Sequence, residues 1–247
     1  MDHSEYLRLS PDGEVAVLFI HGILGSPRHF DLFLPAIPQN WSYRCLLLDG
    51  HGKGVRDFSK SSMRTWRAQV AKAVKELSAT HKRVLIVGHS MGTLLAVDQA
   101  VAGSESVAGL FLLATPLRVV LRLRLLPNLL RVWVNKPKKD DPVSHAFMEA
   151  CSIRQDWCIW RYLGWIPRFW ELLMECRRIR GLLPQLKIPC EAYQSRRDEM
   201  VSLWACRDLA PWAKVTVLEH SSHFYYAPED RERLIRAFDR FCRKNGN

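Results

Sequence analysis

The chain has 247 residues, 48% of them hydrophobic, which predicts a single globular domain with one large core. Its net charge of +11 raises the question of nucleic acid, but no helix-turn-helix, RNA-recognition or zinc-finger pattern accompanies the charge, so we expect no nucleic-acid partner. The longest apolar runs are far too short to span a bilayer, and the N-terminus has neither the basic start nor the apolar segment of a signal peptide.

The first predicted strand, residues 14–20, leads into a glycine-rich turn, His21-Gly22-Ile23-Leu24-Gly25. Such a turn can cradle phosphate, but the Gly-Lys-Ser/Thr ending of a phosphate-binding loop is absent, and we expect His21 to brace the turn. A second strand, residues 43–48, ends in Gly50-His51-Gly52-Lys53-Gly54, whose third glycine comes one position too early for a dinucleotide-binding loop. We interpret this second loop as structural.

An amphipathic helix follows at residues 63–77, where apolar residues recur at spacings of three and four. Residues 84–87 then form an apolar run that predicts a strand buried on both faces, and a helical pattern begins at Met91. Between the two lies Gly88-His89-Ser90-Met91-Gly92. A strand that turns directly into a helix strains the backbone of Ser90, which the flanking glycines tolerate. We therefore predict that Ser90 is a nucleophile at the carboxyl end of the sheet.

This Gly-x-Ser-x-Gly stretch resembles the nucleophile elbow of the α/β-hydrolase family. The resemblance implies the α/β-hydrolase fold, with a mostly parallel central sheet, helices on both faces and a small helical cap insertion. It also implies an oxyanion hole made by two backbone amides. One belongs to Met91, at a helix N-terminus that favours negative charge, and the other to Ile23, in a turn that resembles the family's His-Gly loop.

Residues 106–114 predict the next strand, after which the alternation of strand and helix stops between residue 116 and about residue 170. This segment has ten Lys or Arg residues against four Asp or Glu, and it holds five of the nine tryptophans. It stands where the resemblance implies a cap, so we expect one domain over residues 1–247 with a cap over about 116–170. We expect most of its apolar side chains to bury the cap's own core, and others to line an acyl pocket. Its charges form a solvated face or, alternatively, contact anionic substrates or membrane surfaces transiently.

The regular alternation resumes with a strand at residues 188–194, a short helix at 202–210, a last strand at 215–218 and a final helix at 228–242. Asp198 follows the first of these strands, and His223 follows the last. A serine hydroxyl needs a base such as histidine, which in turn needs a carboxylate to fix its tautomer. The chain order Ser90, Asp198, His223 is the order that the resemblance implies, so we predict these three residues as a catalytic triad.

Asp198 and His223 each have a neighbour in the sequence that could fill the same catalytic role. Glu199 adjoins Asp198, but the Asp198-Glu199-Met200-Val201 stretch resembles the family's acid loop with Asp in the catalytic place. His220 stands three residues before His223, yet the family pattern has a small residue directly before the histidine, as in Ser222-His223. We expect His220 to lie at the edge of the loop.

Metal and redox chemistry are disfavoured by the spacing of histidines and cysteines. None of the nine histidines stands in a His-Glu-x-x-His or comparable arrangement, so we expect no metal and no cofactor. The seven cysteines, an odd number without a Cys-x-x-Cys pair, indicate reduced thiols, with Cys45 a small core side chain. We therefore expect a cytoplasmic protein.

The resemblance to this family implies a serine hydrolase that cleaves carboxylic esters with short to medium acyl chains, including monoacylglycerols. The His-Gly loop and the stretch Arg197-Asp198-Glu199-Met200-Val201 resemble those of small carboxylesterases and monoacylglycerol lipases. The same triad serves thioesterases, amidases and C–C bond hydrolases, and some proteins of this fold only bind ligands. Those alternatives stay open, because the contacts that separate them lie in the cap.

Overall fold

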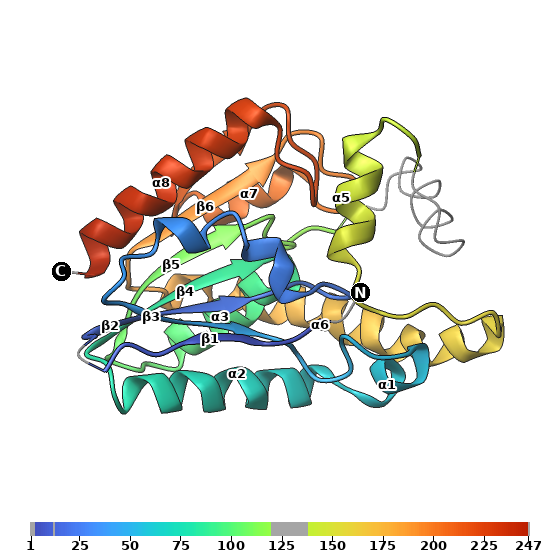
Figure 1. The fold of residues 1–247 in the computed structure, drawn as a ribbon, viewed down its shortest axis with the longest axis horizontal. Helices are drawn as coiled ribbons and strands as arrows, with labels where there is room; N and C mark the ends of the chain where they lie inside the picture. Colours follow the sequence, from blue (N-terminus) through green and yellow to red (C-terminus); the bar gives the residue numbers. More distant parts are fainter. Residues whose placement is uncertain (1–2, 12, 120–137, 247) are drawn as a thin grey trace.

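In the computed structural model, which describes residues 3–11, 13–119 and 138–246, seven strands form one sheet in the order β1-β3-β2-β4-β5-β6-β7 (Figure 1). Neighbouring strands pair in parallel, except that β1 (Tyr6–Arg8) pairs antiparallel with β3 at one edge. This arrangement confirms the predicted mostly parallel sheet. The remaining strands are β2 (Val15–Ile20), β3 (Ser42–Leu46), β4 (Arg83–His89), β5 (Val107–Leu113), β6 (Cys190–Ser195) and β7 (Lys214–Leu218).

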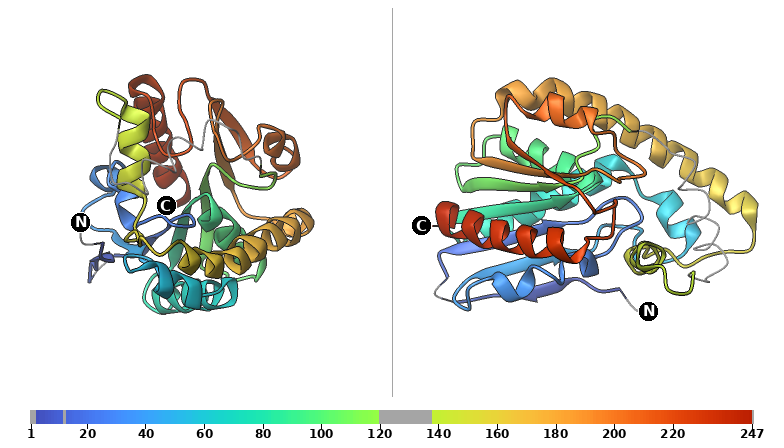
Figure 2. Two further views of the ribbon diagram at one scale, coloured as in Figure 1. Left: turned by 90° about the vertical axis from the view of Figure 1, so that its right-hand side faces the viewer. Right: turned by 90° about the horizontal axis from the view of Figure 1, so that it is seen from above.

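Helices cover both faces of the sheet, as predicted. Figures 1 and 2 show α8 along one face, with α2, α3 and α6 along the other. The helices are α1 (Val55–Lys60), α2 (Met63–Ser78), α3 (Met91–Val101), α5 (Pro142–Ala150), α6 (Ile166–Leu182), α7 (Trp204–Leu209) and α8 (Pro228–Gly246). Four short 3-10 helices join them: η1 (Pro27–Phe30), η2 (Leu34–Ala36), η3 (Ile159–Trp165) and η4 (Leu183–Gln185).

The core consists of two layers separated by the sheet. Alternate residues of β2 point to opposite faces, so Phe19 packs in the layer under α8, whereas Leu18 packs in the layer under α2 and α3. All six residues of β2 are buried, which is why the sequence of this strand is uniformly apolar. Full burial of a side chain of this size contributes roughly 1.5–3 kcal/mol. The two layers hold the strand ends, and hence the loops beyond them, in fixed positions.

The segment between β5 and β6 differs in part from expectation. Residues 120–137 of the predicted cap, with Trp133 among them, lie outside the described residues. The helix α6 begins inside the predicted cap and continues past residue 170, where Leu172, Cys176 and Ile179 are buried against the body of the protein. The expectation that most apolar residues of this segment bury the cap's own core is wrong for Trp157, Trp160 and Trp170, which lie exposed at its surface.

No helix of the described residues is both long and apolar enough to cross a membrane.

The short strand β1 and the helix α1 were not expected from the sequence, because neither is long enough to show a repeat.

Candidate active site

Four parallel strands, β2, β4, β6 and β7, end at the same edge of the sheet, and each is followed by a loop that holds one predicted site residue. Ile23 follows β2, Ser90 follows β4, Asp198 follows β6 and His223 follows β7. Because parallel strands bring their carboxyl ends together, residues separated by up to 200 positions in the chain meet at one place.

Ser90 occupies the predicted sharp turn between β4 and α3. Its backbone has φ 51° and ψ −123°, a conformation that costs a residue with a side chain on the order of 1–3 kcal/mol. Hydrogen bonds on both sides hold this conformation: the Ser90 amide donates to the Leu113 carbonyl at 2.8 Å, and the Thr93 hydroxyl donates to the Ser90 carbonyl at 2.7 Å. Ser90 is only 5% exposed, less than the sequence suggested.

The glycines around Ser90 are required by close backbone approach. A Cβ atom at Gly92 would lie 1.9 Å from the Ile20 carbonyl oxygen, and one at Gly88 would lie 2.7 Å from the Cα of Thr93. A Cβ at Gly22 would lie 2.8 Å from the Cβ of Ser90. The loop after β2 therefore packs directly against the serine side chain, which explains the burial of Ser90.

Two histidines hold that loop in place through hydrogen bonds to backbone groups. The His21 ring donates to the Gly22 carbonyl at 2.8 Å and accepts from the Leu48 amide at 3.0 Å, which confirms its predicted bracing role. The His51 ring accepts from the Leu24 amide at 3.1 Å, so the Gly-His-Gly loop is structural, as interpreted. Burial lowers the pKa of His51 to about 4 and that of His21 well below 6.5, so both rings are neutral.

The loop after β2 and the start of α3 place the two predicted oxyanion-hole residues next to Ser90. Ile23 directly follows Gly22, whose backbone contacts the serine, and Met91 is the first residue of α3. Both side chains are buried in the core. The backbone on either side of Ser90 is thus immobilised, as donors to a developing negative charge must be.

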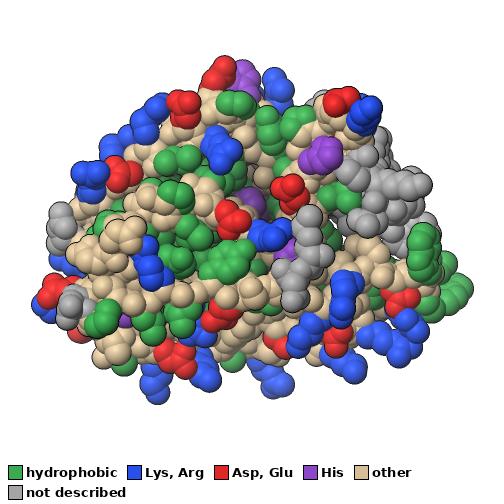
Figure 3. Space-filling view, viewed as in Figure 1, with side chains coloured by type: hydrophobic (Ala, Val, Ile, Leu, Met, Phe, Trp, Pro, Cys, Tyr) green, Lys and Arg blue, Asp and Glu red, His purple; other side chains and the backbone are tan. Residues whose placement is uncertain are grey.

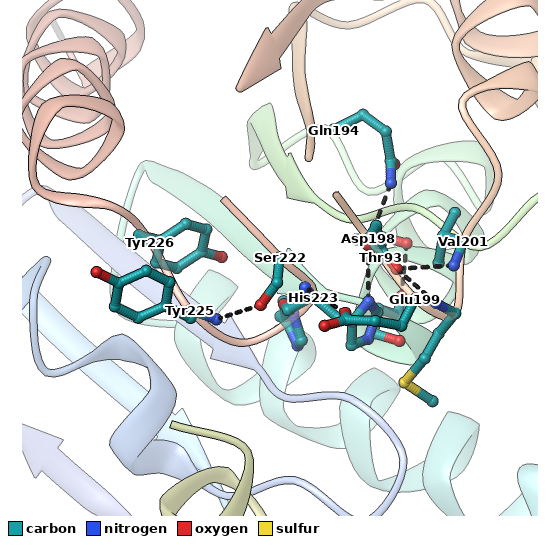
Figure 4. Close-up of polar contacts among 12 residues, drawn as sticks. Thr93, Gln194, Asp198, Glu199, Val201, Ser222, His223, Tyr225 and Tyr226 are labelled. Atoms are coloured by element: carbon teal, nitrogen blue, oxygen red, sulfur yellow. Dashed lines mark hydrogen bonds and ion pairs between the residues drawn. The ribbon is translucent and has the colours of Figure 1, made fainter. Parts of the chain in front are cut away.

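The acid and the histidine are joined by a short hydrogen bond. The Nδ1 atom of His223 donates to Oδ2 of Asp198 at 2.8 Å, and Gln194 donates to the same oxygen at 3.3 Å (Figure 4). The other oxygen, Oδ1, accepts from the amides of Met200 and Val201, each at 2.8 Å. Four donors thus fix the carboxylate, and its contact with Nδ1 leaves the lone pair of the imidazole on Nε2.

That Nε2 atom is buried and has no hydrogen-bond partner among the described residues. A buried acceptor left without a partner costs about 1–3 kcal/mol, which a hydrogen bond from a nearby hydroxyl would offset. In chemical terms, His223 carries a free basic nitrogen in a site largely closed to water. This is the atom that would remove a proton from a hydroxyl.

The loop of His223 is locked against the strand that precedes Ser90. His89, the neighbour of Ser90, donates from Nε2 to the His223 carbonyl at 3.0 Å, and the two rings lie 4.9 Å apart between centroids. The His29 ring packs against the His89 ring, tilted by 37° with the centroids 3.8 Å apart, and forms a hydrogen bond with the Tyr226 hydroxyl at 3.1 Å. Burial and the neighbouring His223 lower the pKa of His29 to about 3. Sequence reasoning missed this cluster of rings, because His29, His89 and Tyr226 come from three separate segments.

Glu199 and His220, the alternatives to the predicted acid and base, occupy different places from Asp198 and His223. Glu199 is buried and accepts from the backbone amide of His223 at 3.2 Å, whereas Asp198 accepts from the imidazole itself. Burial raises the pKa of the Glu199 carboxyl above its ordinary value. The side chain of His220 is about half exposed and lies 3.8 Å from Glu229, at the edge of the loop as expected.

A buried carboxylate at the start of α8 supports the loop from behind. Oδ2 of Asp230 accepts from the His220 amide and from the Ser221 hydroxyl, each at 2.8 Å. Asp230 and Glu229 stand in the first turn of α8, where the helix dipole also favours negative charge. Ser152, after α5, supports the opposite side of the site: its hydroxyl donates to the Gly25 carbonyl at 2.6 Å. Ser152 had no signal in the sequence, since its partner lies 127 residues away.

Among the residues that the structure describes, no three His, Cys, Asp or Glu side chains lie together as metal ligands would. The polar groups at the edge of the sheet are arranged instead as a chain from carboxylate to imidazole, beside a strained serine. Such a chain suits nucleophilic attack by a hydroxyl.

A family model described as "Alpha/beta hydrolase family" matches residues 17–237. No curated protein matches the chain significantly. Among solved structures, one from a report on the metagenome-derived lipolytic enzymes LipS and LipT has a TM-score of 0.74 at 22% identity and covers 97% of both chains. The monoacylglycerol lipase of Paleococcus ferrophilus has a TM-score of 0.71 at 14% identity, covering 99% of this chain and 100% of its own. A thioesterase domain from the curacin biosynthetic pathway has a TM-score of 0.63 at 19% identity, with coverages of 95% and 94%. At these identities the likeness concerns the fold alone.

Proposed function

This chain belongs to the alpha/beta hydrolase family, and we propose that it is a serine hydrolase that cleaves carboxylic esters through Ser90, His223 and Asp198. One observation carries the proposal. The imidazole of His223 is held by Asp198 through Nδ1, and its Nε2 is left without a partner among the described residues, in a loop locked beside the Ser90 turn. A base so prepared has one evident use, which is to activate the adjacent serine.

The reaction proceeds by acyl transfer. Nε2 of His223 takes the proton of the Ser90 hydroxyl as Oγ attacks the ester carbonyl, and the amides of Ile23 and Met91 donate to the resulting oxyanion. His223 then passes the proton to the leaving alkoxide, and a water molecule deacylates Ser90 by the same route. Each oxyanion donor is worth about 2.7–4 kcal/mol of transition-state stabilisation.

We assign the cap role to residues of about 116–170. Two contacts support this assignment within its described part. The Ser152 amide donates to the Leu24 carbonyl at 2.8 Å, and Phe147 of α5 packs edge-on against Phe224, the neighbour of His223, at 5.1 Å. The segment is therefore in contact with both loops that would bind substrate.

Short to medium acyl esters, including monoacylglycerols, are the substrates we propose. A cavity of about 390 Å³ adjoins the histidine loop, between η1 and α5, and includes Phe224 and Tyr226 in its wall. Charged side chains also line it, among them Arg28 of η1, Asp31 directly after η1 and Glu149 of α5. Walls of this kind suit a leaving alcohol with free hydroxyl groups better than a long hydrocarbon.

Hydrolysis of p-nitrophenyl esters from acetate to palmitate tests the proposal. We expect the native protein to turn over medium chains fastest, and we expect Ser90→Ala to lose at least 10³-fold in kcat. Thr93→Ser, one turn along α3, is the matched control, because it keeps the hydroxyl that donates to Ser90. Equal rates for native protein and Ser90→Ala would overturn the triad, and activity confined to thioesters or amides would overturn the substrate class.

We also propose that the protein resides in a reducing compartment. All seven cysteines are free thiols, and Cys45, Cys176, Cys190 and Cys242 are buried in the core. Burial raises the pKa of these four thiols, which keeps them unreactive. We therefore assign the enzyme to the cytoplasm, which fractionation of the source cells with an antibody to the protein would test.

A further inference from the structure

Large apolar side chains form an exposed ridge that begins just before η3 and runs along η3 and the first turns of α6. The ridge consists of Trp157, Trp160, Leu163, Ile166, Trp170 and Leu173, which are 77%, 72%, 56%, 63%, 62% and 42% exposed. Single exposed apolar residues are ordinary, but a contiguous row that includes three tryptophans marks a surface that binds something.

The spacing of the ridge matches the geometry of the helices that carry it. Trp160, Leu163 and Ile166 are three residues apart, which places them on one side of a 3-10 helix. Trp170 and Leu173 continue the row at spacings of four and three along α6. A different side of α6 is buried in the core through Leu172, Cys176 and Ile179. This helix is therefore apolar on two sides, and the body of the protein covers only one of them.

The segment that carries the ridge is anchored to the body of the protein, so its side chains are exposed in a fixed arrangement. Trp165, within η3, is partly buried; its indole donates to the Val55 carbonyl at 3.1 Å and packs edge-on against Phe58 at 5.0 Å. The Arg168 guanidinium donates to the Glu171 carboxylate at 2.9 Å. One tryptophan thus anchors the segment, while its neighbours Trp160 and Trp170 face outward.

Positive charge surrounds the ridge. Residues 53–60 of the adjoining α1 region and residues 154–173 together carry six Lys or Arg against two Asp and one Glu, and two of the six pair with Asp156 and Glu171. Lys53, Arg56, Lys60 and Arg154 are exposed. Figure 3 shows hydrophobic side chains gathered at one end of the molecule, with Lys and Arg along the edge below them. A second copy of this chain would bring two positive rims together, whereas a negatively charged surface would complement them.

The ridge lies at the end of the molecule that holds the site. Figures 1 and 2 show η3 and the start of α6 projecting beyond the body, on the side toward which β4 and β5 point. A surface that contacts the ridge would therefore lie on the same side as the loops of Ser90 and His223.

We propose that the ridge docks the protein onto a lipid surface that carries anionic headgroups. Tryptophan suits this position, because its ring is apolar and its N–H group hydrogen-bonds at the headgroup level. The Lys and Arg residues of the rim supply the attraction to anionic lipid. Docking is independent of the proposed hydrolysis, so the two are tested by different variants.

Co-sedimentation with vesicles tests the proposal, using phosphatidylcholine with 30% phosphatidylglycerol and, for comparison, phosphatidylcholine alone. We expect native protein and Ser90→Ala to bind the anionic vesicles equally, and Trp160→Ser with Trp170→Ser to bind on the order of 100-fold more weakly. Raising the salt concentration should weaken native binding, because the rim charges are screened. The matched control is Trp204→Ser, since Trp204 is 56% exposed on α7, outside the ridge.

Equal binding of the native protein and the double variant would overturn the proposal, as would a native protein that fails to sediment with anionic vesicles. Light scattering during gel filtration decides the main competitor: a native dimer that the double variant converts to monomer, without vesicle binding, would identify a second copy as the occupant and overturn the proposal. Circular dichroism melting of the double variant should match that of the native protein, because the substituted side chains are exposed.

Discussion

The His223 loop and the ridge on η3 and α6 lie at the same end of the molecule but distribute their side chains in opposite ways. In the loop, polar groups are buried, and Asp198, Asp230 and Glu199 each accept at least one hydrogen bond there. In the ridge, Trp160 and Trp170 lie in water. In the first region, burial and hydrogen bonds fix polar atoms in position. In the second region, apolar surface stays exposed to water and is available for binding.

This difference separates what substitutions should do. Removing a polar group from the loop leaves a buried partner without its hydrogen bond, which costs stability and alters the site. Removing an exposed apolar group such as Trp160 from the ridge should change the stability of the folded protein little, because most of that side chain lies outside the packed core. Four predictions follow from this contrast, in order of decreasing effect.

Asp198→Asn should have the largest effect on rate. The asparagine NH₂ group cannot accept from Nδ1 of His223, so the imidazole adopts the wrong tautomer, and kcat should fall on the order of 10⁴-fold. Ester hydrolysis at pH 7.5 measures the loss, with Glu199→Gln as the control, since Glu199 contacts only the backbone of His223 among the bonds described here. A greater loss in Glu199→Gln than in Asp198→Asn would reverse the two assignments.

Acid should destabilise the protein through its buried histidines. The pKa of His29 is about 3 and that of His51 about 4 in the folded protein, against an unfolded value of 6.5. The unfolded chain therefore takes up protons below pH 6.5 that the folded chain does not, so stability is present above that pH and lost below it. Between pH 7.5 and 5 the loss is about 2 kcal/mol per histidine.

Urea unfolding at the two pH values measures this loss, and equal free energies of unfolding would contradict it. Glu199 acts in the opposite direction: its raised pKa favours the folded state as pH falls, because the neutral carboxyl suits its buried place. Glu199→Gln removes that opposing contribution. The free energy of unfolding of this variant should therefore fall more steeply between pH 7.5 and 5 than that of the native protein.

Asp230→Ala should lower the free energy of unfolding by about 2–3 kcal/mol, since the His220 amide and the Ser221 hydroxyl lose their acceptor. The same loss should reduce kcat, because these two residues lead into His223. Asp230→Asn keeps an acceptor oxygen and should recover part of both losses. If the alanine variant kept native stability and rate, the loop would not depend on α8.

Trp160→Ser should change the free energy of unfolding by less than about 0.5 kcal/mol, the smallest effect of the four, because the side chain is 72% exposed. Chemical unfolding measures it, and Trp165→Ser is the informative comparison: that indole is bonded to Val55 and packed on Phe58, so its loss should be several times more costly. Similar losses in both variants would show that the ridge is packed in solution.

The sheet and the Ser90 turn could be predicted because their signals are local. Five consecutive residues specify the strained turn, and uniform apolar runs specify the buried strands. Asp198 and His223 were predicted from their places after successive strands and from the resemblance of their loops to those of the family, since their hydrogen bond joins residues 25 positions apart. Strand ends differ from prediction by one or two residues, because hydrogen bonding to neighbours, rather than hydropathy, fixes where a strand stops.

The supporting contacts could not be predicted. Ser152 bonds to Gly25, and the His89 ring bonds to the His223 carbonyl 134 residues away, and neither pair leaves a pattern in its own segment. The exposure of Trp160 was also misjudged, because apolar residues in a helical pattern are usually buried. Such features depend on how distant segments meet, which composition and periodicity do not encode.

The proposed activation of Ser90 can be tested most directly by labelling with a fluorophosphonate, followed by intact mass measurement and peptide mapping. We predict a single adduct on Ser90 in the native protein, no adduct in Ser90→Ala, and much slower labelling of His223→Ala, because the base that activates the hydroxyl is gone. Rapid labelling of the native protein at another residue, or labelling of Ser90 at equal rates with and without His223, would contradict the proposed mechanism.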